Sequence, residues 1–422
     1  MLEKKAGISM YVKSLSVKNL RCFVEAEVKF WYPGRAEDGP ELPNINLLLG
    51  DNGAGKTTLL RAVALAVLSE IIPSSGYVPY NLLRQDLAKP RGGGASFRAE
   101  VRACLALDAA DWGQRSGSLP DSIEVGSTIE RIRSGELISP LPLAEGEAGS
   151  LREVLYDDLS PAFLLVGYGA TRWIVGVSEF EPLANQRRRR RPRYQRVAGL
   201  FEEHLGLTPL AAWYPRQSES RKAEIGEILG DLLPDGSSFL GRRVETDEED
   251  YLFSHRGVGV PLGAMSDGYR AYIGWVTDLL SHIATGTPST ARLRDAHGVV
   301  LIDEIDLHLH PEWQRQVVPV LARVFPRLQF ILTTHSPIVA GTLSRQNIFV
   351  LDGEQVAQLP EPIHGLNADQ ILIGPYFNLE TTRAPGAIEE LQRLSKRAMH
   401  GDHDAALTYL EKLAVGFDEP ET

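Results

Sequence analysis

A glycine-rich run at residues 50–57 is the clearest sign of chemistry in the sequence. It reads Gly-Asp-Asn-Gly-Ala-Gly-Lys-Thr and has the spacing G-x-x-x-x-G-K-[ST]. Glycines allow backbone N–H groups to surround phosphate oxygens, and the N-terminus of a following helix adds positive potential. In this pattern the lysine reaches the β- and γ-phosphates and the hydroxyl residue holds Mg²⁺. We expect phosphate contacts from Asn52, Gly53, Ala54, Gly55, Lys56, Thr57 and Thr58.

Two acidic residues, Asp303 and Glu304, directly follow the apolar run Val299–Ile302. Two carboxylates at the end of a buried strand are costly unless they have partners or a function. We expect Asp303 to anchor Mg²⁺ together with Thr57, and Glu304 to orient the water that attacks the γ-phosphate. The structural alternative is that the two acids only cap the next turn.

Two further segments have residue types suited to phosphate binding. His335 follows the apolar run Leu328–Thr333, where it can sense the γ-phosphate, although an isolated histidine there is more often a packing residue. Ser266, Asp267 and Gly268 stand at the start of a predicted helix, where they form either an anion site or an ordinary N-cap.

The elements that must position these residues follow from hydrophobic periodicity. Period-two alternation predicts two N-terminal strands within residues 12–30, joined near Asn19–Arg21. Apolar strands are predicted at Ile45–Leu49, Phe163–Val166, Val299–Ile302, Leu328–Thr333 and Ile348–Leu351, and strands also at Phe97–Leu107 and Ser122–Ile132. Strands that alternate with helices predict a mostly parallel sheet in an α/β fold.

Helices are predicted from residue 59 onward, at Tyr269–Ile283 and at Pro311–Phe325, with a helical pattern over Leu200–Leu233 and two tail helices at Ala387–Met399 and Asp404–Val415. We expect four parts. These are the N-terminal part of an ATPase core with a β-rich insert (1–175), a basic loop with a helical insert (176–262), the C-terminal part of the core (263–360) and a helical tail (361–422).

Composition restricts the class of protein. The chain has 422 residues, 43% hydrophobic and 23% charged, which is ordinary for a globular protein of more than one domain. The net charge of −11 argues against a general polyanion binder. Cys22 and Cys104 are too few for a disulfide framework, and both are expected to be buried. No segment has the pattern of a signal peptide or membrane span, so we expect a cytoplasmic protein.

Arginine fills positions 187–191 and recurs at 193 and 196. Five adjacent like charges repel one another, which favours an exposed loop; the alternative is a contact with a nucleic-acid backbone, so nucleic acid is a possible partner through Arg187–Arg196. An acidic cluster at residues 245–250 is either solvated or paired with the arginines of a neighbouring subunit.

In their order, these motifs resemble the ABC-type ATPases. The resemblance rests on the glycine loop, the Met-Ser-Asp-Gly-Tyr-Arg segment at 265–270, the Ile-Asp-Glu-Ile-Asp-Leu-His-Leu-His-Pro segment at 302–311 and the Thr-His-Ser-Pro segment at 334–337. More narrowly, the chain resembles the soluble AAA family ATPases of the SMC/RecF/OLD-like group, many of which act in bacterial anti-phage defence. The opening strands and the Tyr-Gly-Ala-Thr-Arg segment at 168–172 fit this group too, whereas residues 71–155 and those from 377 onward match only loosely.

The resemblance implies an ABC-type P-loop fold with a mixed, mostly parallel sheet, an N-terminal antiparallel β part and a helical insert. It also implies ATP hydrolysis with Mg²⁺, with Lys56, Glu304 and His335 as the catalytic residues. Residues 265–269 match the family's signature loop, which binds the γ-phosphate held by the other subunit, so a homodimer or larger homo-oligomer with shared ATP sites is expected. Asp267 replaces a glycine of that loop, and His310 replaces the usual aspartate of the dimer-interface loop. Neither Gln85 nor Gln186 is a convincing Q-loop glutamine.

Three functions are compatible with this resemblance. The favoured one is a regulatory or scaffold ATPase of an anti-phage complex, similar to Septu or retron-associated ATPases, that controls a separate nuclease or toxin. The second is a RecF-like repair clamp that binds DNA, and the third is the ATPase of a membrane transporter. The sequence shows no coiled-coil arm of an SMC machine, and the segment after His335 lacks the acidic cluster of a TOPRIM nuclease.

Overall fold

The structure is a computed structural model of the chain. It describes residues 9–35, 38–85, 97–108, 122–143, 164–174, 180, 191–203, 205–233, 236–243, 251–255 and 257–414. The chain divides into two compact units, Met1–Asn367 and Ala368–Thr422.

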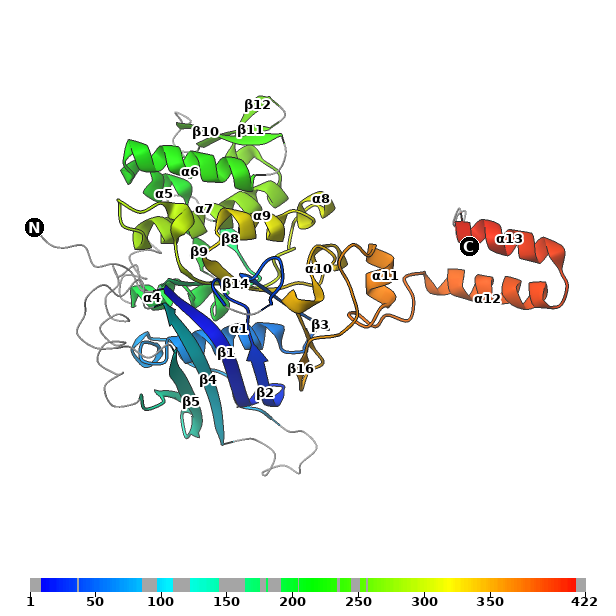
Figure 1. Cartoon of the computed structure of the whole chain (residues 1–422), viewed down its shortest axis with the longest axis horizontal. Coiled ribbons are helices and arrows are strands. Elements are labelled where there is room, and N and C mark those ends of the chain that lie inside the picture. The colour runs from blue at the N-terminus through cyan, green and yellow to red at the C-terminus, as the bar shows by residue number, and fades with distance from the viewer. Residues whose placement is uncertain are drawn as a thin grey trace, which may run out of the picture. The chain divides into compact units, whose positions relative to one another are not determined.

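A six-stranded sheet forms the centre of the first unit (Figure 1). Five of its strands are parallel, and only the edge strand named first below is antiparallel to its neighbour. The strands, in spatial order, are β16 (Val356–Ala357), β15 (Ile348–Leu351), β3 (Ile45–Gly50), β14 (Leu328–Thr333), β13 (Gly298–Ile302) and β7 (Leu165–Tyr168). Strands β3, β14, β13 and β7 are buried almost throughout, as expected when both faces of a parallel sheet are covered. The predicted parallel sheet is confirmed, and β7 begins two residues later than predicted.

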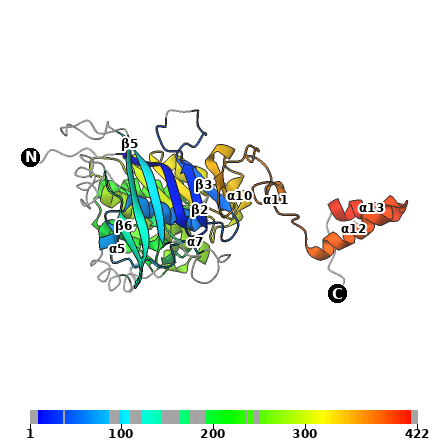
Figure 2. The ribbon, with the colours of Figure 1, turned by 90° about the horizontal axis from the view of Figure 1, so that it is seen from below.

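A five-stranded antiparallel sheet covers one side of this unit. Its order is β2 (Phe23–Lys29), β1 (Ser9–Leu20), β4 (Arg98–Asp108), β5 (Ser122–Ile132) and β6 (Gly135–Pro140). Helix α1 (Lys56–Val67) packs between the two sheets (Figure 1), and Figure 2 shows the strands of the antiparallel sheet in front of this unit. Ten of its 12 residues are buried, because a helix that is apolar all round needs cover on every side. The predicted N-terminal strands and the helix after the glycine loop are therefore confirmed.

Two buried amide side chains join the N-terminal strands to the central sheet. Asn46 of β3 accepts from the Trp31 N–H at 2.7 Å and donates to the Trp31 carbonyl at 2.8 Å. Gln329 of β14 accepts from the Val12 N–H and donates to the Val12 carbonyl, both at 2.8 Å. Each amide side chain takes the place of a neighbouring strand's backbone as hydrogen-bond partner. The buried N–H and carbonyl groups of Trp31 and Val12 are therefore satisfied.

Helices and a small sheet lie on the other side of the six-stranded sheet (Figure 1). The helices described in the rest of this unit are α4 (Pro192–Gln195), α5 (Leu210–Trp213), α6 (Glu219–Leu232), α7 (Asp267–Gly286), α8 (Pro311–Gln314), α9 (Val317–Val324) and α10 (Pro337–Ala340). A three-stranded antiparallel sheet is made of β10 (Ser237–Arg243), β11 (Tyr251–His255) and β12 (Val258–Pro261). Two short strands, β8 (Trp173–Ile174) and β9 (Gly206–Leu207), pair in parallel.

Two predicted helical segments need correction. The single helix predicted at Pro311–Phe325 is two helices, α8 and α9. Pro319 lacks an N–H, and its ring would clash with the carbonyl four residues earlier, at Arg315, where the break lies. The helical pattern at Leu200–Leu233 is interrupted as well, because β9 precedes α5 and a 3₁₀ turn separates α5 from α6.

The arginine-rich segment only partly matches the prediction of an exposed loop. Positions 187–190 and the acidic cluster at 245–250 lie outside the described residues. Arg191 is exposed, but Arg193 and Arg196 are 1% and 7% exposed, because α4 turns them into the core beside Tyr194. These two arginines therefore cannot form part of an exposed nucleic-acid contact. Cys22 and Cys104 are free thiols of intermediate exposure, less buried than predicted.

The second unit contains α11 (Ala368–Ile373), α12 (Pro385–Met399) and α13 (His403–Ala414). The last two form a hairpin whose turn contains Gly401 at φ 91° and Asp402, which caps α13 through the Ala405 N–H at 3.0 Å. Lys412 and Glu390 join the two helices at 2.6 Å. Both predicted tail helices are confirmed within two residues at each described end. Within the described part of the chain, no helix is long and apolar enough to cross a membrane.

Candidate functional site: a phosphate loop beside two acids

The glycine loop joins the end of β3 to the start of α1, and two of its glycines are required by their surroundings. Gly55 has φ 101°, and a Cβ there would lie 2.5 Å from Phe23 Cζ and 2.6 Å from Cys22 Sγ. Gly50 has φ 149°, and a Cβ there would lie 2.4 Å from the Leu351 carbonyl oxygen. Such contacts exclude any side chain, so the loop can pass close to β2 and β15 only with glycine at these positions.

Lys56 lies over the loop that precedes it. Its ammonium donates to the carbonyl oxygens of Gly50 at 2.7 Å and Asp51 at 3.0 Å, and the residue is 6% exposed. Burial lowers the pKa of this ammonium, while the nearby carboxylates of Asp303 and Glu304 oppose that shift. The cation is thus held where the loop, the helix N-terminus and the acids meet. The other predicted loop residues surround it: Asn52 and Gly53 are exposed, whereas Ala54 and Thr58 are buried.

The two halves of the predicted site meet at Asp303. Its Oδ2 accepts from the Thr57 hydroxyl at 2.7 Å, and its Oδ1 accepts from the Thr333 hydroxyl at 2.6 Å. The register of β13 with β14 and of β14 with β3 brings the carboxyl ends of these strands to one edge of the sheet. Thr333 was part of a predicted strand, but no role was predicted for its side chain. Its position as a hydroxyl residue at the end of the strand next to β13 could have indicated a contact with Asp303.

Glu304 follows Asp303 in a left-handed conformation with φ 50°, uncommon for a residue other than glycine. Its N–H donates to Thr333 Oγ1 at 2.7 Å. Its carbonyl accepts from the Arg172 guanidinium at 2.8 Å, and the same NH2 group also donates to the Asp303 carbonyl. Burial lowers the pKa of Arg172 to about 10, against the effect of the surrounding carboxylates, so the side chain remains a cation at neutral pH.

His335 lies between two anchored neighbours just after β14. Thr334 donates to Asp306 Oδ1, and Ser336 donates to Gln314 Oε1 at 2.7 Å. Ser336 also caps the four-residue helix α10 by accepting from the Ile338 and Val339 N–H groups. The half-buried imidazole is therefore carried on a backbone fixed on both sides.

Ser266, Asp267 and Gly268 form the N-terminus of α7. Ser266 is exposed, and its hydroxyl does not cap its own helix. A Cβ on Gly268 would lie 2.6 Å from the carbonyl oxygen of His308, so α7 packs closely against the loop that follows the two acids. Within the described part of one chain, no hydrogen bond or ion pair joins residues 266–268 to the glycine loop or to Asp303 and Glu304.

A buried carboxylate links α7 to the end of β7. Asp278 Oδ2 accepts from the Tyr168 hydroxyl at 2.7 Å and lies 3.3 Å from His282 Nε2, while Oδ1 accepts from the Thr208 N–H at 2.7 Å. Burial alone would raise the pKa of Asp278, but these three partners together hold it below its usual value. Sequence reasoning did not find this contact, because its residues are far apart in the chain.

The residues at Asp303 fit a magnesium ion. Mg²⁺ prefers oxygen donors and takes most of its ligands from water and phosphate, with one or two from protein. Thr57 and Asp303 present a hydroxyl and a carboxylate oxygen together beside the phosphate loop. Among the described residues no group of three or more His, Cys, Asp or Glu side chains is placed to hold a metal ion. The site therefore suits a metal that arrives with a phosphate.

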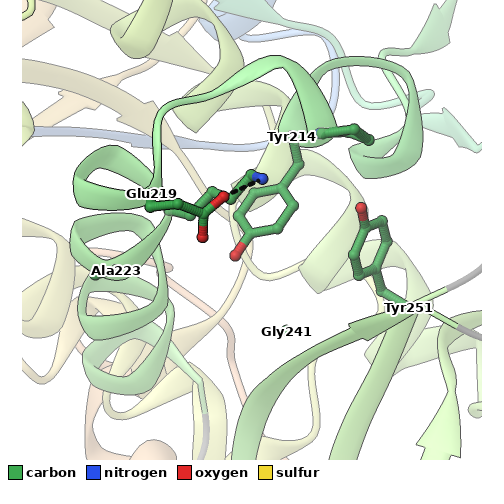
Figure 3. A pocket seen from close by; sticks show the side chains of 7 residues that line it. Tyr214, Glu219, Ala223, Gly241 and Tyr251 are labelled. Atoms are coloured by element: carbon green, nitrogen blue, oxygen red, sulfur yellow. Dashed lines mark hydrogen bonds and ion pairs between the residues drawn. The ribbon is translucent and has the colours of Figure 1, made fainter.

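A separate pocket of about 420 Å³ lies between α6 and the strands β10 and β11 (Figure 3). Tyr214 and Tyr251 form part of its wall, with ring centroids 5.3 Å apart. Its cation, Lys222, is paired with Glu219 at 2.8 Å. Among the described residues that line this pocket, the one cation is thus already paired, and the pocket is distinct from the site at the glycine loop.

Comparisons with known proteins agree with this geometry. Residues 14–101 match a family model described as an AAA domain, and residues 175–340 match one described as "AAA domain, putative AbiEii toxin, Type IV TA system". Among solved structures, the SMC head bound to the C-winged helix domain of ScpA aligns with a TM-score of 0.50 and 16% identity, over 83% of this chain and 97% of that chain. The fold is an ABC-type P-loop fold.

Two curated relatives are similar in sequence. Septu protein PtuA of Bacillus mycoides (strain KBAB4) is 25% identical over 386 residues, which cover 90% of this chain and 46% of that protein. The Retron Ec83 probable ATPase of Escherichia coli is 35% identical over 148 residues, or 35% of this chain and 27% of that protein. The chain thus spans less than half the length of both relatives. Two segments of the chain thus match AAA domains, and its sequence is similar to a Septu protein and to a retron probable ATPase.

Proposed function

We propose that the chain binds ATP with Mg²⁺ at the glycine loop and hydrolyses it. The observation that carries this proposal is the 2.7 Å hydrogen bond between Thr57 and Asp303, which unites residues 246 positions apart at one edge of the sheet. Lys56, held 6% exposed beside them, supplies the cation for the β- and γ-phosphates. Thr57 and Asp303 hold Mg²⁺, which, when bound, neutralises charge on the phosphate oxygens.

Glu304 is the proposed general base. Its carboxylate orients a water molecule and accepts the proton as that water attacks the γ-phosphorus, and the bond to the β-phosphate oxygen breaks. His335 contacts the γ-phosphate. Support comes from the fixed backbone on which each side chain is carried: both the N–H and the carbonyl of Glu304 are hydrogen bonded, and the neighbours of His335 are anchored.

We further propose that two copies share each ATP. Ser266 is exposed at the N-terminus of α7, where the helix dipole favours binding of a phosphate. Asp267 beside it is paired with Arg270 at 3.0 Å, and this pairing reduces the repulsion between the Asp267 carboxylate and a phosphate. In the head-to-tail arrangement, residues 266–268 of one copy close over the nucleotide on the glycine loop of the other. ATP binding then stabilises a dimer or a larger homo-oligomer, and hydrolysis releases it.

The biological role that we propose is the regulatory or scaffold subunit of a bacterial anti-phage defence complex that controls a separate nuclease or toxin. Support comes from relatives named for Septu and retron systems, one of which aligns with 90% of this chain. The assembly state set by ATP would hold or release the effector.

Two measurements test this function. Purified wild-type protein should hydrolyse ATP in the presence of Mg²⁺, whereas Glu304→Gln should bind ATP and fail to turn it over. In cells that carry the gene with its neighbouring genes, phage plating should fall with the wild-type gene and recover with Lys56→Ala. Equal plating with both genes would overturn the defence role, and wild-type turnover by Glu304→Gln would overturn the assigned base.

A further inference from the structure

Arg172 occupies an unusual place for an arginine beside an acidic site. It follows β7 by four residues, and β7 pairs with β13, the strand that ends in the two acids. The ladder continues past the strand end, since the Asp303 N–H donates to the Tyr168 carbonyl at 2.8 Å. The guanidinium then donates to the carbonyl oxygens of Asp303 and Glu304, and not to either carboxylate.

This choice of acceptor matters for the proposed base. An arginine bound to the Glu304 carboxylate would occupy the oxygens that must accept a proton from water. Arg172 binds the backbone instead, which leaves those oxygens available while its positive charge stays close. Its Nε is buried and has no hydrogen-bond partner within the described residues, so the side chain is held by its NH2 end.

The backbone of Glu304 needs such support. A left-handed conformation is strained for a residue other than glycine and persists only where the surroundings hold it. At Glu304 the N–H is held by Thr333 of β14, and the carbonyl is held by Arg172 from the end of β7. Thr333 at the end of β14 and Arg172 in the segment after β7 thus hold both polar backbone groups of the residue.

Arg172 also contacts the helix that begins at Ser266. Its guanidinium carbon lies 5.8 Å from the ring centroid of Trp275, a residue of α7 that is 1% exposed. This distance is within the range of a cation–π contact. One side chain therefore touches the backbone of the proposed base and the helix that would close over the nucleotide of the second copy.

We propose that Arg172 is a positioning residue for Glu304, which sets the orientation of the base and couples it to α7 through Trp275. The inference rests on the proposed ATP hydrolysis. Arg172→Ala should lower kcat about 100-fold, since a misplaced reactive group costs about that much, and should leave KM and the Kd for ATP within about threefold. Arg172→Lys, which keeps a donor and the charge, should recover part of kcat.

A double-mutant cycle separates positioning from a general structural effect. Because Arg172 acts through Glu304, adding Arg172→Ala to Glu304→Gln should lower the residual rate by less than about twofold. If the rate losses of the two single variants multiply in the double variant, the two residues act independently and the inference is overturned. Arg292→Ala, which removes an exposed arginine whose ion pair among the described residues is with the partly exposed Asp295, is the matched control and should behave as wild type.

The outcomes also separate this inference from the proposed function. If the wild type and Arg292→Ala bind ATP but neither hydrolyses it, the ATPase proposal fails. If both are active and Arg172→Ala keeps their kcat, only the role of Arg172 fails. If Arg172→Ala cannot be purified, Arg172→Lys decides: an unchanged kcat, or a loss of ATP binding as large as the loss of kcat, would overturn the role.

Discussion

The hydroxyl of Thr57 lies 2.7 Å from Oδ2 of Asp303, across a gap of 246 residues in the chain. This hydrogen bond joins the first residues of α1 to the residue that follows β13. In the proposed function, Thr57 and Asp303 would hold one metal ion between the phosphate loop and the acids.

Thr57→Ala should therefore weaken the use of Mg²⁺. It removes the proposed hydroxyl ligand and leaves the Asp303 carboxylate with Thr333 as its hydrogen-bond partner among the described residues, so the Mg²⁺ concentration for half-maximal ATPase activity should rise roughly 10–100-fold. A magnesium titration at fixed ATP measures this shift. Thr408→Ala, on α13, is the control; an identical Mg²⁺ dependence in both variants would contradict the metal assignment.

The close approach of the loop to β2 gives a second prediction. Gly55→Ala places a methyl group within 2.6 Å of both Phe23 and Cys22 atoms and imposes φ 101° on alanine. Gly365→Ala, at φ 81° with no atom within 4 Å of the added methyl, shares only the backbone strain. Gly55→Ala should thus lose more unfolding free energy than Gly365→Ala, by roughly 1–3 kcal/mol. Denaturation of both variants checks this, and equal losses would show that the loop can move away from β2.

Gln329 provides a prediction about stability alone. Gln329→Leu leaves the buried N–H and carbonyl of Val12 without their side-chain partner, which should cost roughly 2–4 kcal/mol. Gln358→Leu, an exposed glutamine in the same unit, should change the unfolding free energy by less than about 0.5 kcal/mol. If chemical denaturation gave the two variants equal stability, the amide would not be what joins β1 to the central sheet.

Much of this arrangement could be predicted from local patterns. The strands at Ile45 and Val299 are short apolar runs, and the G-x-x-x-x-G-K-T spacing locates the turn between strand and helix within one residue. Because parallel strands place their carboxyl ends at one edge, the meeting of Thr57 with Asp303 followed from the fold class.

Contacts that depend on tertiary pairing could not be predicted. Arg172 reaches Glu304 only because β7 lies next to β13, and no local pattern specifies that order. Arg193 and Arg196 lie in an arginine-rich segment, yet α4 buries them, so charge density alone predicted the wrong environment. Hydrophobic periodicity favoured one continuous helix over Pro311–Phe325. The ring of Pro319 excludes a regular helical turn at Arg315, so the helix breaks before α9.

The buried carboxylate Asp278 gives a prediction about pH. Tyr168→Phe removes a hydrogen bond to a charged group, which should cost roughly 1.5–3 kcal/mol at neutral pH, whereas the exposed Tyr80→Phe should cost almost nothing. The pKa of Asp278 is depressed in the folded state, so this stabilisation is present above the unfolded value of about 3.9 and is lost as the pH falls through the folded value. Denaturation curves should show the difference between wild type and Tyr168→Phe shrinking below about pH 4; a constant difference down to the acid limit would contradict the assignment.

Photolabelling can show whether one ATP is held by two copies of the chain. The probe is an ATP analogue with a photoreactive aryl azide on its γ-phosphate. A tagged Lys56→Ala copy, which should not bind nucleotide itself, is mixed with untagged wild type and irradiated in the presence of Mg²⁺. If the site is shared, label should reach the tagged copy, and adding Ser266→Arg to that copy should abolish its labelling. Label confined to the wild-type copy would contradict the shared site.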